Sequence, residues 1–447
     1  MAMDPTSRSY RAIRKIARAV VRSYYSTIEA TGSDRVDARV ATLYAPTHPN
    51  SILDPLLVGL YEDRPIRFVA RDGLFDIPGF GALLRAAGAI PIARRSDHGG
   101  EVDNSAAFTA CLDALRAGGA IVLFPEGKTH GRLRVEPLRT GLARIALDAK
   151  EHGVDVRIVP VGLNYLVRHA FRSDVHVAFG EPIAPEGEVR ELTSRIEREL
   201  RELSVHIERE DDERLIAQLT MLVADIRERE GADRAATPAE RVALARRVVD
   251  AYRWLEERDP ERTSILRDRL QALLETRAEL GLGGERPALQ HRGEAVRHKK
   301  WTGDPMLFAL AAPLALYGVV NHAPAYLAMR AALALSPPSF AQGALFRLGV
   351  GAGALAIAYG VQSALVGGTL GPGLGVLYAL SLAPSGLFAR RYLAELRVHR
   401  LGPRRFFRAL ASRDRLAWFR AERDALSEEL AEIRREYLAQ HGELVPA

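Results

Sequence analysis

Short apolar runs alternate with amphipathic stretches between residues 36 and 186. Apolar runs bounded by turn residues predict buried strands, here over Val40–Tyr44, Ile66–Ala70, Ala89–Ala93, Ala120–Phe124, Arg157–Val161 and His176–Phe179. Helical spacing of apolar residues predicts helices between most of them, over Ile52–Tyr61, Phe80–Ala87, Ser105–Ala117 and Leu138–Lys150. This alternation predicts an α/β domain with a mostly parallel sheet flanked by helices.

Residues 1–35 precede this domain, and their pattern from residue 8 to residue 29 is basic and amphipathic. Apolar residues recur at helical spacing from Tyr10 to Ile28, and basic residues occupy much of the remaining surface. A helix of this kind can lie on an anionic bilayer. The alternative is an ordinary surface helix packed on the domain.

Residues 187–300 are strongly charged and have helical periodicity. We predict helices over Glu188–Ile207, Glu213–Glu230, Pro238–Glu257 and Glu261–Leu280, folded back on the α/β domain. Thr237 and Glu240 have the spacing of a capping box, with Pro238 at the first helical position. Gly281–Gly293 is predicted to be a loop or hinge. A partner-binding role for this region is the alternative to simple packing.

Residues 301–392 are membrane-like. No Asp, Glu, Lys or Arg occurs from Pro305 to Met329 or from Leu348 to Ala389, and a span needs about 20 apolar residues. The pattern predicts two to three hydrophobic helices, with a buried soluble core as the alternative. Asn321 and His322 lie inside the first run, where hydrogen bonds between packed helices are their expected role.

Basic segments on both sides of this region constrain its topology. His291–Lys300 and Arg390–Arg408 are both basic and favour the cytoplasmic side, whereas three full spans would separate them. We therefore expect one piece, Gly367–Pro384, to be re-entrant or interfacial. Residues 393–447 are predicted to end the chain as a charged cytoplasmic helix.

The net charge of +6 fits nucleic acid, an anionic membrane surface or an anionic substrate, without choosing among them. The single cysteine, Cys111, lies in an apolar helical pattern and is predicted to be buried. One cysteine excludes a disulfide framework within the chain and a cysteine metal site.

The first candidate site residues are His48 and Asp54, which follow the strand predicted to end at Tyr44. Asn50 or Ser51 is the expected N-cap of the next helix. With His48 in the loop and Asp54 in the first helical turn, the carboxylate can orient the imidazole and stabilise its charged form. A capping pair without catalytic role is the alternative.

Three further clusters also follow predicted strands, at an edge where α/β folds place their sites. Arg94 and Arg95 end the first, and guanidiniums suit bidentate phosphate contacts. Phe124-Pro125-Glu126-Gly127-Lys128 is the second, in which Gly127 lets backbone approach a ligand. Ile158–Tyr165 is the third. Each alone has a structural explanation, but together they can converge at one edge.

In this order, the four clusters resemble the four blocks of the glycerol-phosphate and lysophospholipid acyltransferases (PlsC-like). The resemblance extends to Phe68–Pro78, to Pro137–Gly141 and to Phe171–Pro182, and it covers roughly residues 24–186. Five residues separate His48 from Asp54, where the family usually has four. This spacing resembles the branch of fungal glycerol-3-phosphate and dihydroxyacetone-phosphate acyltransferases and their bacterial relatives.

The resemblance implies an O-acyltransferase. His48 is then the general base on a glycerol-backbone hydroxyl, and Asp54 orients it. Arg94 binds the acceptor phosphate, with Lys128 or Arg139 in support, and Glu126 and Gly127 belong to the same binding block. The donor is acyl-CoA or an acyl carrier protein, and no acyl-enzyme, cofactor or metal is expected. No Gly-x-Ser-x-Gly elbow occurs.

These features imply acyl transfer to glycerol 3-phosphate or 1-acylglycerol 3-phosphate in phospholipid synthesis. The expected location is a phospholipid membrane, with the catalytic domain on its cytoplasmic face and no nucleic-acid partner. Two alternatives are an acyltransferase for another lysophospholipid or hydroxylated lipid, and a non-catalytic membrane scaffold.

Overall fold

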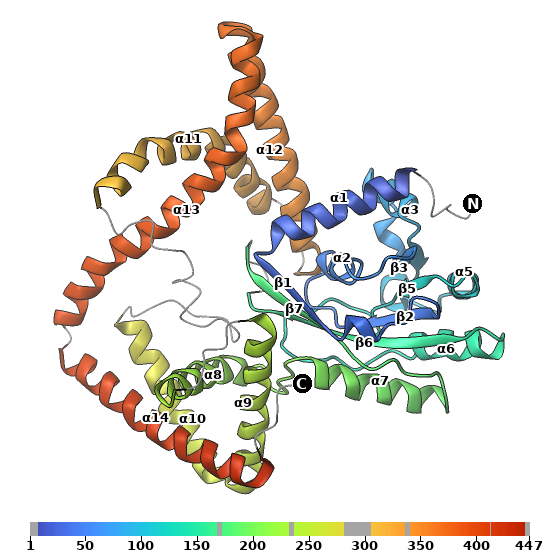
Figure 1. The fold of residues 1–447 in the computed structure, drawn as a ribbon, viewed down its shortest axis with the longest axis horizontal. Helices are drawn as coiled ribbons and strands as arrows, with labels where there is room; N and C mark the ends of the chain where they lie inside the picture. Colours follow the sequence, from blue (N-terminus) through green and yellow to red (C-terminus); the bar gives the residue numbers. More distant parts are fainter. Residues whose placement is uncertain are drawn as a thin grey trace. The chain divides into compact units, whose positions relative to one another are not determined.

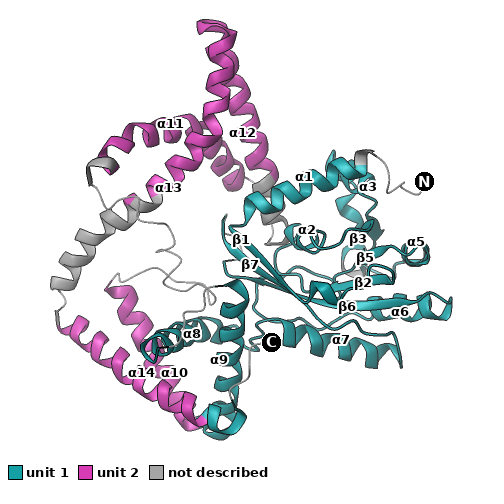
Figure 2. Cartoon of the chain, in the orientation of Figure 1, with its two compact units in different colours: residues 1–260, 287–290, 437–447 teal, residues 261–286, 291–436 magenta. Residues whose placement is uncertain are grey.

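The computed structural model describes residues 8–167, 172–231, 237–280, 305–335, 340–411 and 413–442. The chain divides into two compact units (Figure 2). Unit 1 comprises residues 1–260, 287–290 and 437–447, and unit 2 comprises residues 261–286 and 291–436.

A seven-stranded sheet forms the centre of unit 1 (Figure 1). Its strands are β1 (Thr27–Thr31), β2 (Ala41–Pro46), β3 (Ile66–Arg71), β4 (Ile90–Ile92), β5 (Ala120–Val122), β6 (Val156–Tyr165) and β7 (Asp174–Phe179), in the order β1-β7-β6-β2-β5-β3-β4. Strands β6, β2, β5, β3 and β4 are mutually parallel. Strand β7 is antiparallel to β6, and β1 is parallel to β7. The sheet is mostly parallel, as predicted.

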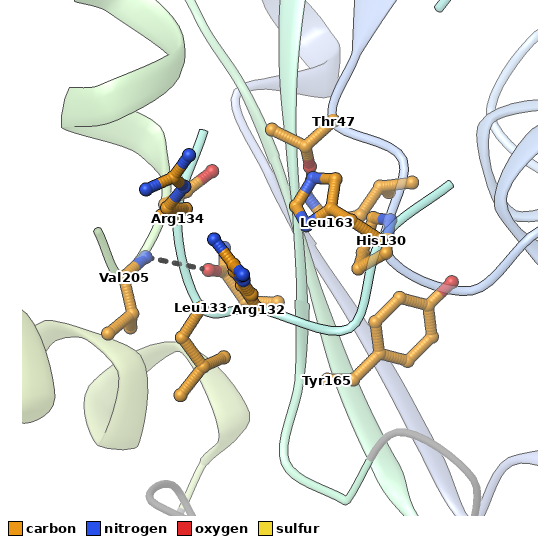
Figure 3. A pocket seen from close by; sticks show the side chains of 11 residues that line it. Thr47, His130, Arg132, Leu133, Arg134, Leu163, Tyr165 and Val205 are labelled. Atoms are coloured by element: carbon orange, nitrogen blue, oxygen red, sulfur yellow. Dashed lines mark hydrogen bonds between the residues drawn. The ribbon is translucent and has the colours of Figure 1, made fainter. Parts of the chain in front are cut away.

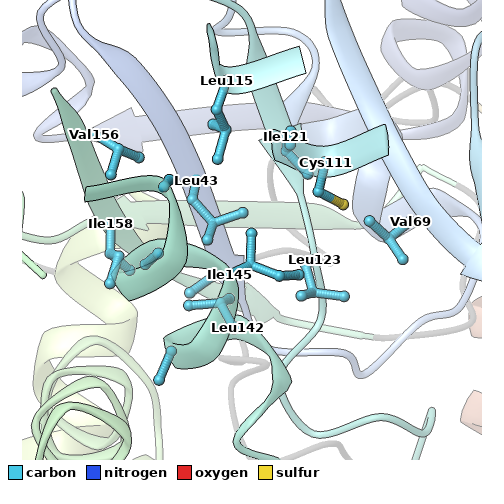
Figure 4. Close-up of a cluster of buried hydrophobic side chains, with 14 of the residues drawn as sticks. Leu43, Val69, Cys111, Leu115, Ile121, Leu123, Leu142, Ile145, Val156 and Ile158 are labelled. Atoms are coloured by element: carbon cyan, nitrogen blue, oxygen red, sulfur yellow. The ribbon is translucent and has the colours of Figure 1, made fainter. Parts of the chain in front are cut away.

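Helices cover both faces of this sheet. The first half of the chain contributes α1 (Arg8–Tyr24), α2 (Leu53–Val58), α3 (Phe80–Ala86), α4 (Arg95–His98), α5 (Ser105–Arg116), α6 (Gly141–Glu151) and α7 (Val189–Leu203). Helices α5, α6 and α7 pack on one face, where β2 contributes Leu43 (Figure 4). Helices α1 and α2 pack on the other, where β2 contributes Tyr44. Successive strand residues therefore enter different cores, which explains the continuous apolar runs.

Cys111 lies in the core beneath α5, as predicted, with 1% of its surface exposed. Burial raises the pKa of its thiol to about 12. A thiol that stays protonated in an apolar core is unreactive, so this cysteine contributes packing.

The helix expected over residues 8–29 ends at Tyr24, and residues 27–31 form strand β1 instead. Ile28 fits the helical spacing, but Thr27, Ile28 and Thr31 are β-branched and pair in register with β7, beginning at Thr27 opposite Asp174. The strand partner lies far away in the sequence, so local periodicity did not reveal it.

Helix α1 packs on unit 1 and also presents a basic surface. Arg14 and Arg18 bind the Asp63 carboxylate at 3.1 and 3.0 Å. On the exposed side lie Arg11, Lys15 and Ile16, the last with 64% of its surface exposed. The helix therefore packs on the domain, as one of the two alternatives expected, and its exposed side is basic.

The charged region forms α8 (Asp212–Arg229), α9 (Pro238–Arg258) and α10 (Pro260–Glu279). The predicted capping box of Thr237 and Glu240 is present. The Ala239 amide donates to Glu29 on β1 at 2.8 Å, and buried Arg241 pairs with Asp174 on β7 at 2.9 Å. Helix α9 thus folds back on the sheet, as expected. The predicted loop Gly281–Gly293 and the basic segment His291–Lys300 lie outside the described residues.

Unit 2 contains α11 (Pro305–Leu335), α12 (Phe340–Leu370), α13 (Pro372–Ala411) and most of α14 (Arg413–His441). Three helical segments are long and apolar enough to cross a membrane: Phe308–Leu335, Gly349–Leu370 and Pro372–Leu393. At most 22% of any of these apolar windows is buried, which argues against a soluble core.

The expectation of a re-entrant piece over Gly367–Pro384 is wrong. The helical break is confined to Gly371, whose φ of 103° favours glycine, and α13 then continues for 40 residues. Asn321 and His322 do make the expected hydrogen bonds between helices. Gln362 donates to the Asn321 carbonyl oxygen at 3.0 Å, and His322 Nε2 lies 2.6 Å from the Tyr359 hydroxyl.

Candidate active site

The candidate residues follow the carboxyl ends of parallel strands. His48 follows β2, Glu126 follows the adjacent β5, and Tyr165 ends β6 on the other side of β2. Arg94 follows β4 at the end of the strand order. Candidate residues from three neighbouring strands therefore lie at one edge of the sheet, as the sequence predicts.

His48 and Asp54 form a hydrogen-bonded pair. His48 Nδ1 lies 2.8 Å from Asp54 Oδ2, and the side chains are 13% and 0% exposed. The imidazole also stacks on Phe124, with ring centroids 3.8 Å apart and planes inclined by 22°. Because a carboxylate only accepts, the proton of a neutral imidazole sits on Nδ1, which leaves Nε2 as the bare nitrogen.

The turn between these residues differs from the expected capping arrangement. Helix α2 has Ile52 as its N-cap, without a side-chain cap bond. Asn50 instead donates its backbone N–H to Asp54 Oδ2 at 2.7 Å, and Ser51 has a φ of 54°. The capping prediction for Asn50 or Ser51 is therefore wrong. The tight turn nevertheless brings His48 and Asp54 together across their unusual spacing.

Two tyrosines complete the surroundings of Asp54, and sequence reasoning gave neither a role. The Tyr165 hydroxyl donates to Asp54 Oδ1. The Tyr25 hydroxyl accepts from the Asn50 side-chain amide at 3.1 Å. Burial, and next the Asp54 charge, raise the pKa of both phenols well above the ordinary value. Tyr165 lies in the fourth cluster, but its contact with Asp54 spans 111 residues, beyond any local signal.

Glu126 points into the protein, with its side chain fully buried. Its Oε2 accepts the His48 backbone N–H at 2.8 Å, and its Oε1 accepts the Glu136 N–H at 3.1 Å. His130 Nε2 also lies 3.1 Å from Oε1. One carboxylate thus ties the loop after β2 to the loop after β5.

The rest of this block forms a turn. Gly127 has a φ of 71°, and a Cβ there would approach Arg139 Cγ to 3.3 Å. The Arg139 backbone N–H donates to the Pro125 carbonyl at 2.7 Å. The Lys128 ammonium lies 3.3 Å from the Glu136 carboxylate. The hydrogen bond from Arg134, and next that from Lys128, lower the pKa of this carboxyl to about 2.

Arg94 and Arg139 supply guanidinium groups near the same edge. Partial burial lowers the pKa of Arg94; nearby Arg71 and Arg139 lower it further, while Asp97 and Asp72 oppose them. Within the described part of the chain, neither Arg94 nor Arg139 has an ion pair or side-chain hydrogen bond. Arg94 is partly buried and Arg139 is exposed, and guanidiniums without partners are suited to binding an anion.

A small pocket lies against the loop that carries His48. Thr47, Leu163, Tyr165 and His130 are among the residues that line it (Figure 3). Its wall is fixed by Asn164, whose side chain accepts the Val205 N–H at 3.1 Å and donates to Leu203. Across the described ranges, no group of three or more His, Cys, Asp or Glu side chains could hold a metal ion.

The fold and the site together give an α/β domain with a His–Asp pair and two guanidiniums near one edge of its sheet. Residues 27–164 match the family model described as Acyltransferase. They therefore form an acyltransferase-family domain.

Curated relatives agree with this family. Glycerol-3-phosphate O-acyltransferase 2 and 1 of Saccharomyces cerevisiae are 36% and 41% identical over 101 and 85 residues, which are 22% and 19% of this chain. These segments span 14% and 11% of the yeast proteins. The Brassica napus 1-acyl-sn-glycerol-3-phosphate acyltransferase BAT2 is 27% identical over 32% of this chain and 40% of its own length.

Among solved structures, the 1-acyl-sn-glycerophosphate acyltransferase PlsC from Thermotoga maritima is similar, with a TM-score of 0.35 and 20% identity. The match covers 43% of this chain and 78% of that one.

Glu126→Ala is expected to lower the free energy of unfolding by about 2 kcal/mol or more, because buried donors lose their acceptor. The midpoint of thermal unfolding measures the loss. Glu181→Ala is the control, since that carboxylate is 72% exposed and pairs with Arg35. Equal midpoints for the two variants would show that Glu126 does not join the loops.

Proposed function

We propose that this protein transfers a fatty acyl group from acyl-CoA or acyl carrier protein to a hydroxyl of glycerol 3-phosphate or 1-acylglycerol 3-phosphate. The hydrogen-bonded His48–Asp54 pair, within an acyltransferase-family domain, carries the proposal. The unpaired guanidiniums of Arg94 and Arg139 support an acceptor with a phosphate.

In this mechanism His48 Nε2 takes the proton from the acceptor hydroxyl. Asp54 holds the Nδ1 proton and stabilises the imidazolium that forms. The hydroxyl oxygen attacks the thioester carbonyl, an ester bond forms, and the carbon–sulfur bond breaks. The imidazolium then returns its proton to the leaving thiolate, so no acyl-enzyme is formed. Phe124 holds the ring by stacking on one face.

The acceptor phosphate is proposed to bind Arg94 and Arg139. Lys128 is a weaker candidate because Glu136 already neutralises it at 3.3 Å. Glu126 and Gly127 fix the conformation of this segment. The Glu126 carboxylate accepts hydrogen bonds from the protein backbone, and Gly127 allows the turn beside Arg139. Fixed placement of both substrates supplies much of the rate in such a reaction.

The substrate chemistry also requires a membrane surface, because long acyl chains and their products partition into a bilayer. We propose that the three apolar helices anchor the chain and that the catalytic domain lies on the cytoplasmic face. The exposed basic side of α1 supports contact with anionic lipid.

Radiolabelled acyl-CoA incubated with a panel of acceptors tests the proposal. Labelled lysophosphatidate or phosphatidate is the expected product. Transfer only to other lysophospholipids or hydroxylated lipids would change the acceptor, and no transfer to any acceptor would favour a non-catalytic scaffold.

His48→Ala is expected to abolish transfer, and Asp54→Asn to lower kcat about 10²- to 10⁴-fold, since general-base catalysis loses its base or its orientation. Steady-state assays measure both. His152→Ala, at a half-exposed histidine on the C-cap of α6, should retain full activity. Near-normal turnover of His48→Ala would exclude it as the base.

Arg94→Ala is expected to raise the KM of the phosphate acceptor far more than that of the acyl donor. Losing a charged hydrogen bond costs roughly 1.5–3 kcal/mol. Arg157→Ala is the control, because Arg157 pairs with Asp155 at the amino end of β6. Equal changes in both KM values would assign Arg94 a structural role.

The full chain is expected to resist salt and alkaline extraction from membranes and to need detergent. Deleting residues 301–447 should leave a protein that still binds anionic vesicles, with binding that weakens as salt screens the charges. Fractionation and vesicle flotation measure this, with zwitterionic vesicles as the control. Release of the full chain by high salt would contradict the membrane anchor.

A further inference from the structure

Asp54 is surrounded by three donors from two parts of the chain, and its two oxygens are used differently. Oδ2 lies 2.8 Å from His48 Nδ1 and accepts the Asn50 backbone N–H at 2.7 Å. Among the described residues, Oδ1 accepts a hydrogen bond only from the Tyr165 hydroxyl. The side chain is fully buried, so solvent does not compete for either oxygen.

Tyr165 reaches Asp54 from the end of β6 and is itself 5% exposed. Burial and the neighbouring carboxylate raise the pKa of its phenol well above the ordinary range. The hydroxyl therefore keeps its proton and donates to Asp54 throughout the physiological pH range. Tyr165 therefore contacts the carboxylate of Asp54, whereas the residue that stacks on the His48 ring is Phe124.

Tyr25 extends this arrangement by one step. It is 1% exposed, and its ring lies 5.8 Å from that of Tyr165. Its oxygen accepts the Asn50 side-chain amide at 3.1 Å, and the Asn50 backbone N–H donates to Asp54 Oδ2 at 2.7 Å. Tyr25 therefore holds a second donor of Asp54 in place.

We propose that Tyr165 is a positioning residue that acts through Asp54, with Tyr25 and Asn50 holding the other oxygen of that carboxylate in place. This inference rests on the proposed function. A carboxylate with one unfilled oxygen can rotate about its last side-chain bond, and its other oxygen would then leave His48. Tyr165 fixes that rotation, so the imidazole keeps a single tautomer and orientation.

A double-mutant cycle tests whether Tyr165 acts through Asp54. Tyr165→Phe should lower kcat roughly ten- to hundredfold, the cost of a small misplacement, while the KM values of donor and acceptor stay nearly constant. In an Asp54→Asn background the same substitution should change kcat little, because the partner is already lost. Equal factors in both backgrounds, or full activity of Tyr165→Phe, would overturn the proposal.

Tyr44→Phe is the matched control. Tyr44 is 1% exposed, and its hydroxyl donates to the Glu62 carboxylate at 2.9 Å, away from His48. This variant loses the same type of bond and should retain wild-type kcat. If Tyr165→Phe does not fold, Tyr25→Phe replaces it, with a smaller loss of kcat that also disappears in the Asp54→Asn background. A Tyr25→Phe loss that persists there would overturn the proposal.

A second readout is independent of turnover. Diethyl pyrocarbonate modifies neutral imidazole, and mass spectrometry follows the modification of His48 at one fixed pH. In Tyr165→Phe the rate of modification should differ from that in wild type and Tyr44→Phe, because the ring is no longer held in one orientation. An unchanged rate would overturn the role of Tyr165. Absence of acyl transfer by the wild type would instead overturn the proposed function alone.

Discussion

The buried carboxylate of Asp54 is the constraint on which the site depends. A charge taken out of water is costly unless hydrogen bonds replace its solvation. Here the replacements come from the loop between β2 and α2 and from the end of β6. Satisfying one carboxylate therefore fixes the relative positions of these two segments, and the orientation of His48 follows from that requirement.

Glu126 repeats this principle on the other side of His48. Its buried carboxylate accepts the His48 backbone N–H and also binds the loop after β5. The histidine is held by its main chain through Glu126 and by its ring through Asp54. Arg94 and Arg139 differ, because they have no such partners within the described residues. Groups that place the imidazole are satisfied internally, whereas groups suited to an anion remain available.

Much of this arrangement follows from sequence pattern. Apolar runs located β2, β3, β4, β5 and β6, and His48, Arg94 and Glu126 were found because they follow such runs. The resemblance then supplied roles that spacing alone leaves open. The Asp54–Tyr165 contact could not be predicted, because it depends on β6 lying beside β2 and joins residues distant in sequence.

Local pattern failed where a distant partner decides the structure. Residues 27–31 continue the periodicity of α1, yet they form β1 because β7 offers backbone partners. Asn50 looked like a helix cap, but the buried carboxylate of Asp54 captures its amide. The piece Gly367–Pro384, expected to be re-entrant or interfacial, is helical on both sides of Gly371, because one residue with a positive φ is enough to separate two long helices.

The pairing of β1 with β7 also determines the order in which the domain can be completed. Thr27 lies opposite Asp174, so the first strand waits for a partner until most of the domain has been synthesised. Closing such long loops is slow because their entropy is lost before contacts repay it. His48 and Asp54 can meet early within their own turn, whereas Tyr25 and Tyr165 join only when both ends of the domain are in place. The pair of His48 and Asp54 is therefore a local contact, whereas the surroundings that hold it depend on contacts across the whole domain.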